Sequence, residues 1–150
     1  MFYNVGSMTG FNHVLVGVTI AVAVQQPILA PILAFGSHFV LDALPHYWND
    51  TYVPWNKKFI RLLSIDAALC FAVLAFAIWL FPHLWWLLAL CAFMATLPDW
   101  LWILHFGLNK QHWFFTFHKK IQWAEKPWGL WIEVPFGCLM TLILVLLAKH

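Results

Sequence analysis

Long apolar stretches, each close to 20 residues and almost free of charge, limit most strongly what this chain can fold into. A membrane-spanning helix needs about 20 such residues, because the hydrocarbon core of a bilayer is about 30 Å thick. The chain has 150 residues, of which 63% are hydrophobic and 9% charged. A soluble domain of this size could not bury so much apolar surface. The sequence therefore predicts one integral membrane domain over residues 1–150, and it excludes disorder and nucleic-acid binding.

The predicted fold is all-α, with about five transmembrane helices. The expected spans are 9–24, 27–45, 59–81, 83–106 and 129–148. A tight turn at Gln25-Gln26-Pro27 separates the first two spans, and Pro82 breaks the third from the fourth. Residues 109–128 mix Trp and Phe with Lys, which is typical of an amphipathic helix lying in the headgroup layer.

The basic residues predict the orientation of these spans. Loops between five spans alternate sides, and seven of the eight Lys and Arg residues fall on the side of the N-terminus. They are Lys57, Lys58, Arg61, Lys110, Lys119, Lys120 and Lys126. Cytoplasmic loops carry an excess of Lys and Arg. We therefore expect a cytoplasmic N-terminus and a C-terminus outside.

The first two helical hairpins share a spacing that suggests internal duplication. His13 precedes His46 by 33 residues, and Asp66 precedes Asp99 by the same number. An offset of 53 residues superposes His13 on Asp66, and it also superposes a Leu-Pro-His tripeptide on a Leu-Pro-Asp tripeptide. Duplication would place these residues around a pseudo-two-fold axis along the membrane normal. Coincidence is the alternative, since few other positions match.

Each predicted span carries an acid or an imidazole toward its cytoplasmic side. An Asp at the centre of a membrane helix costs about 2.5–3.5 kcal/mol on insertion scales, so each one needs a reason. The residues are His13, His38, Asp42, Asp66, Asp99 and Glu133. Unrelated polar residues would be distributed over both leaflets, so their position in one leaflet predicts a shared site.

The sharpest local pattern is His38 followed by Asp42, an i, i+4 pair on one helix face. This spacing lets two helical side chains reach one metal ion, and a hydrogen-bonded pair that only satisfies itself is the alternative. His46 is eight residues after His38 and could continue the face, unless Pro45 ends the helix first. Imidazole and carboxylate ligands suit Zn²⁺, with Mn²⁺ or Fe²⁺ as alternatives, and the ligands suffice for one ion or two.

The interfacial segment carries a second polar set. His118, Gln122 and Glu125 are four and three residues apart, so a helix would place them on one face. That face could close over the intramembrane site, or it could be the solvated side of an amphipathic helix. An acid or imidazole outside the metal ligands can act as general acid or base. On this basis the candidate catalytic residues are Asp66, His118, Glu125 and Glu133.

Three motifs carry a family resemblance. The segments MTGFNHVLVG, SHFVLDALPH and LPDWLW resemble small bacterial inner-membrane proteins of the membrane-bound metal-dependent hydrolase group, to which the LexA-regulated inner-membrane hydrolases belong. The resemblance covers about the first 105 residues. It implies a bacterial inner-membrane location and metal-binding positions at His13, His38, Asp42 and Asp99, with His46 as a weaker match.

The leading hypothesis is a metal-dependent hydrolase acting on a lipid-like phosphate or ester at the cytoplasmic leaflet. Asp66 lies about 10 Å inside its span at 1.5 Å per residue, a depth that suits a lipid-like substrate. A proton- or ion-coupled transporter would also use intramembrane Asp, Glu and His, but a permeation path should have polar groups in both leaflets. A scaffold with a structural metal is a third reading. The Trp-rich surface suits membrane lipids or a second copy of the chain.

Overall fold

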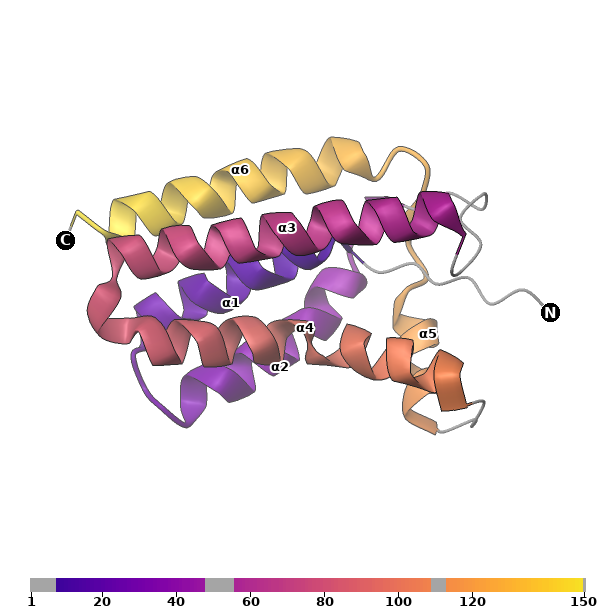
Figure 1. Cartoon of the computed structure of the whole chain (residues 1–150), viewed down its shortest axis with the longest axis horizontal. Helices are drawn as coiled ribbons and strands as arrows, with labels where there is room; N and C mark the ends of the chain where they lie inside the picture. The colour runs from indigo at the N-terminus through magenta and orange to yellow at the C-terminus, as the bar shows by residue number, and fades with distance from the viewer. Residues whose placement is uncertain (1–7, 48–55, 109–112, 150) are drawn as a thin grey trace.

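A computed structural model describes residues 8–47, 56–108 and 113–149, and of residues 102–108, 115, 119 and 125 it describes the backbone alone. The described residues form six α-helices, one 3-10 turn and two very short strands (Figure 1). In order they are α1 (Gly10–Val24), α2 (Leu29–Asp42), β1 (His46–Tyr47), α3 (Lys57–Leu80), η1 (Pro82–Leu84), α4 (Trp85–Leu108), α5 (Trp113–Ile121), β2 (Glu125–Lys126) and α6 (Leu130–Leu147).

The predicted helical character is confirmed, and three helical segments are long and apolar enough to cross a membrane. They cover Lys57–Leu80, Pro82–Leu101 and Leu130–Leu147. The other two apolar helices, α1 and α2, have 15 and 14 residues. At 1.5 Å per residue they are each about 20 Å long, which is shorter than the hydrocarbon core.

Local chemistry explains where the helices begin and end. Gln25 adopts the left-handed conformation with φ 51°, and the side-chain oxygen of Gln26 accepts hydrogen bonds from the first amides of the next helix. The Asn56 side chain caps α3 by accepting a hydrogen bond from the Phe59 amide at 2.7 Å. The predicted end of the second span at residue 45 is wrong. Helix α2 stops at Asp42, three residues before Pro45, which disfavours helical geometry in the residue before it.

The helices alternate in direction, as the sequence predicted. The start of α3, helix α5 and the start of α6 lie at one end of the molecule (Figure 1). The connection from α3 to α4 and the C-terminal end of α6 lie at the opposite end. Helix α4 changes direction partway along, and it contains Pro98, which removes one backbone hydrogen bond from the helix.

The core is built from small and branched apolar side chains, whereas large aromatic ones point outward. Gly17 allows α1 to approach α4 closely, because a Cβ there would meet the Cys91 carbonyl oxygen at 2.7 Å. Trp79 and Trp131 are 74% and 83% exposed on the outer faces of α3 and α6. Outward-facing Trp and Phe suit contact with lipid rather than with water.

The interfacial segment differs from the single helix predicted over 109–128. Residues 109–112 lie outside the described part, α5 ends at Ile121, and β2 follows at Glu125. Strand β2 pairs in parallel with β1, with Glu125 opposite His46. Glu125 is therefore not on a helical face with His118, contrary to the prediction. Gly129 is required beside this pairing, because a Cβ there would overlap the backbone of His46 and Tyr47.

Candidate metal centre

Buried polar side chains collect at one end of the described bundle. They are Asn12, His13, His38, Asp42, His46, His118, Gln122 and Glu133. Elsewhere in the described core the buried polar side chain is Thr19, whose hydroxyl donates to the Leu15 carbonyl of its own helix at 2.7 Å. Apart from Thr19, the buried polar side chains of the described residues therefore lie in one half of the bundle.

Four residues from three helices meet in this layer. His38 and Asp42 come from α2, Asp99 from α4 and His118 from α5, and one ligand atom from each lies within 4.8 Å of all the others. The side chains of His38, Asp42 and His118 are fully buried, whereas Asp99 is 22% exposed. Such a group could hold a metal ion, and its open side is the side of Asp99.

Three of these ligand atoms form a tight triangle. His38 Nε2 lies 3.1 Å from Asp42 Oδ2 and 3.1 Å from His118 Nε2, and His118 Nε2 lies 2.7 Å from the same Asp42 oxygen. With metal–ligand bonds of about 2.1 Å, neighbouring ligands are about 3.0 Å apart in an octahedron and about 3.4 Å apart in a tetrahedron. The triangle therefore has the dimensions of one octahedral face.

The tautomer of His38 is fixed by the backbone of α4. Its Nδ1 lies 2.8 Å from the Ala95 carbonyl oxygen. A carbonyl only accepts, so Nδ1 must donate, and Nε2 of the neutral ring carries a bare lone pair. In metal sites, a hydrogen bond of this kind from the other ring nitrogen to a backbone carbonyl orients the imidazole toward the ion.

The cluster needs one more positive charge than two neutral imidazoles supply. The lone pair of neutral His38 faces an Asp42 oxygen and the Nε2 atom of His118, and one proton on His118 can serve only one of these neighbours. Buried lone pairs that converge without a positive charge repel one another strongly in a medium of low dielectric. Either an additional proton or a metal ion satisfies the arrangement.

Gln122 completes the surroundings of Asp42. It lies one helical turn after His118, and its side-chain nitrogen donates to Asp42 Oδ2 at 3.3 Å. Gln122 was expected on the same helical face as His118, but it was not among the predicted site residues. The Ala95 carbonyl was missed as well, because no side-chain pattern marks a backbone acceptor.

His13 lies against the cluster from α1. Its ring stacks on that of His38, with centroids 4.2 Å apart and an interplanar angle of 20°. Its Nε2 atom lies 3.3 Å from the second oxygen of Asp42, Oδ1. The structure thus brings together four of the five predicted metal positions, namely His13, His38, Asp42 and Asp99, and adds His118 to them.

His46 lies in β1, outside the four-residue group. Its Nδ1 atom bonds to the Leu44 carbonyl at 2.8 Å, and its buried Nε2 has no hydrogen-bond partner among the described residues. Pro45 has turned the chain out of α2, so His46 does not continue the face of His38. The side chain of Glu125 lies outside the described part of the molecule.

Two other acidic residues bind peptide groups at the start of α1. Asp66 accepts hydrogen bonds from the amides of Gly10 and Phe11 at 2.9 and 3.1 Å. Glu133 accepts from the Thr9 amide and hydroxyl at 3.1 and 2.7 Å, and from the Tyr47 amide at 2.6 Å. The first amides of a helix have no partner within the helix, and they carry partial positive charge that carboxylates satisfy.

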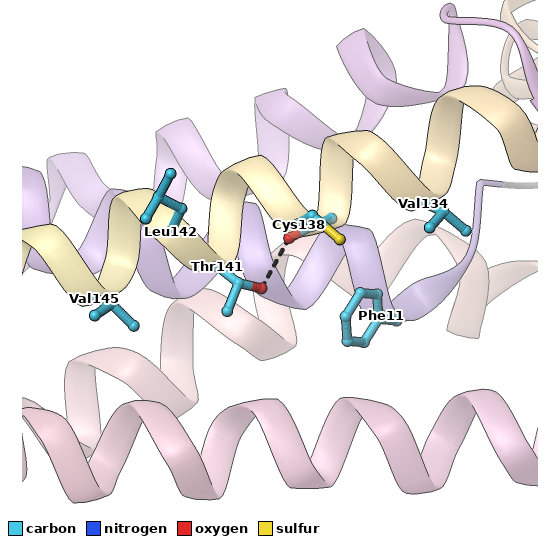
Figure 2. Close-up of a pocket in the computed structure, with 7 residues that line it drawn as sticks. Phe11, Val134, Cys138, Thr141, Leu142 and Val145 are labelled. Carbon is cyan, nitrogen blue, oxygen red and sulfur yellow. Dashed lines mark hydrogen bonds between the residues drawn. The ribbon is translucent and has the colours of Figure 1, made fainter.

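An apolar groove of about 560 Å³ lies elsewhere, along α6. Figure 2 shows the side chains that line it, with Phe11 of α1 facing α6. The Thr141 hydroxyl in the groove donates to the Gly137 carbonyl at 2.8 Å. None of the lining side chains is a carboxylate or an imidazole. The groove therefore suits lipid chains, whereas the candidate metal ligands lie in the polar layer.

Comparison of the chain with protein-family models, curated proteins and solved structures finds no match. The functional conclusion therefore depends on the geometry of the polar layer.

Proposed function

We propose that this protein is a membrane-embedded, metal-dependent hydrolase acting on a lipid-like phosphate or ester at the cytoplasmic leaflet. The observation that carries the proposal is the triangle of His38 Nε2, Asp42 Oδ2 and His118 Nε2, with Asp99 at its open side. The family resemblance of the sequence motifs, which points to the same reaction class, supports it.

The ligand set favours a six-coordinate ion. Edges of 2.7–3.1 Å suit Mn²⁺ or Fe²⁺ better than tetrahedral Zn²⁺ among the three predicted ions. With Asp99 the set has two imidazoles and two carboxylates, which distinguishes it from the two-imidazole, one-carboxylate triad of iron oxygenases. A bound divalent ion would activate a water molecule and polarise a phosphoryl or acyl oxygen.

The residues in and around the cluster have different roles in this proposal. Asp99 is the partly exposed ligand of the cluster, so it lies on the side from which a substrate would approach. Gln122 holds Asp42 in orientation, and the Ala95 carbonyl holds His38. Asp66 and Glu133, candidate catalytic residues by sequence, have both oxygens engaged by α1 and β1, so we assign them a supporting role.

The proposal includes an orientation of the helices in the membrane. Helices α1 and α2 complete five membrane-embedded helices, because α2 exposes apolar side chains such as Ile32 and Val40. Lys57, Lys58 and Arg61 begin α3 at the end that holds the polar layer. By the positive-inside rule this end faces the cytoplasm of an inner membrane, and the substrate would enter from that leaflet.

A transporter is the competing function, and the core of the described bundle disfavours it. Away from the polar layer the core is apolar, with residues such as Val18, Ala77 and Leu88. A conduit for protons or ions would need polar groups there as well.

Metal content of detergent-purified protein tests the proposal. We expect about one or more equivalents of a transition metal in the wild type, measured by inductively coupled plasma mass spectrometry, and loss of metal in His38→Ala. His83→Ala is the matched control, because His83 is exposed at the opposite end of the bundle. Metal-free wild type after reconstitution, together with proton or ion flux that requires Asp42, would replace the hydrolase by a transporter.

A further inference from the structure

Asp42 presents its two oxygens to different imidazoles, one oxygen to two rings and the other to a third. Oδ2 faces His38 and His118, at 3.1 and 2.7 Å. Oδ1 faces His13 at 3.3 Å and also accepts the Met8 amide at 3.3 Å. A carboxylate offers about four lone-pair positions, so each oxygen can bind a cation beside these contacts.

His13 is buried without a satisfied ring nitrogen. Its side chain is fully buried, and neither Nδ1 nor Nε2 has a hydrogen-bond partner among the described residues. The approach of Nε2 to Asp42 Oδ1 is close, yet it lacks the alignment of a hydrogen bond. Two ligands of one ion are related in this way, because each lone pair points at the ion and not at the neighbouring ligand.

The stacking of the two imidazoles sets the spacing. The centroids of His13 and His38 are 4.2 Å apart and their planes nearly parallel, at 20°. The two rings lie one above the other, and their Nε2 atoms face different oxygens of the Asp42 carboxylate. Ions in two-metal hydrolytic sites are about 3.5–4 Å apart, which is close to the distance between these two rings.

We propose that Asp42 bridges two divalent metal ions, with His38 and His118 on the first and His13 on the second. This inference rests on the proposed metal centre and extends it. The second ion has two ligand atoms from the described residues, Asp42 Oδ1 and His13 Nε2, so it is the weaker and more exchangeable of the two. Its remaining positions suit water or an oxygen of a phosphate or ester.

Titration with Mn²⁺ tests the bridge on the purified, full-length protein stripped of metal. The bound ions are counted by mass spectrometry, and their coupling is followed by electron paramagnetic resonance. We expect two Mn²⁺ ions of unequal affinity and an exchange-coupled spectrum in the wild type. His13→Ala should lose one equivalent and the coupling, while retaining one Mn²⁺ with an isolated six-line spectrum. His83→Ala should bind as the wild type does.

Each other result decides against the bridge in a distinguishable way. One uncoupled Mn²⁺ in both wild type and His13→Ala would leave the hydrolase proposal standing and reduce His13 to an ion pair with Asp42. Loss of all Mn²⁺ from a folded His13→Ala would make His13 a ligand of a single ion. No Mn²⁺ in the wild type would overturn the metal centre itself. If His13→Ala does not fold, His13→Gln replaces it, and the wild-type spectrum alone still decides whether two ions are coupled.

Discussion

Asp42 and Asp66 are both acids of the polar layer, yet they face different partners. Every oxygen of Asp42 faces an imidazole, whereas every oxygen of Asp66 accepts a peptide amide from the start of α1. Glu133 resembles Asp66, since it too binds the beginning of that helix. Converging lone pairs need a cation, but a carboxylate facing amides is already satisfied. An acid in a membrane helix therefore identifies a metal site only through what it faces.

The comparison predicts its largest effect at Asp42. Asp42→Asn keeps the shape of the side chain but removes the charge and replaces one oxygen ligand by a donor that repels a cation. We expect metal affinity to fall by more than the 10–100-fold that is typical of second-shell changes. Asp66→Asn, the same chemical change in the other setting, should retain the metal. Equal metal loss in the two variants, measured on folded protein, would erase the distinction between the acids.

Glu133 provides the second test, in which stability and not metal binding should change. Glu133→Gln removes the charge that binds the Thr9 hydroxyl and the amides of Thr9 and Tyr47. Hydrogen bonds to charged groups contribute about 1.5–3 kcal/mol each, so we expect a loss of about 2–3 kcal/mol in the free energy of unfolding. Thermal unfolding in detergent measures it.

A matched control for Glu133 lies on the same helix. Thr141→Ala removes a hydroxyl bonded only within α6 and should change stability by less than about 0.5 kcal/mol. If Glu133→Gln left the melting temperature unchanged but abolished hydrolysis, Glu133 would return to the catalytic role that the sequence suggested.

The sequence predicted much of this arrangement because the constraints were local or compositional. Apolar length fixed the long helices, and the i, i+4 spacing placed His38 beside Asp42. His118 was selected as an acid–base residue, but its approach to Asp42 depends on how α5 folds back against α2, a tertiary contact that no local pattern encodes. Nor does spacing reveal that Asp66 and Glu133 bind amides, since a catalytic acid and an amide-binding acid would both be buried at the same depth.

The smallest effect is expected at Asp66, and it measures how much a carboxylate contributes when its partners are amides. Asp66→Asn keeps one acceptor for the amides of Gly10 and Phe11 but loses the charge that favours the positive end of α1. Loss of a helix cap costs about 0.5–2 kcal/mol, so we expect destabilisation of about 1 kcal/mol. Ser64→Ala is the control, because its exposed hydroxyl bonds only to Ile60 of the same helix. A lower melting temperature with unchanged metal content would establish Asp66 as a cap, whereas metal loss without destabilisation would place it among the ligands.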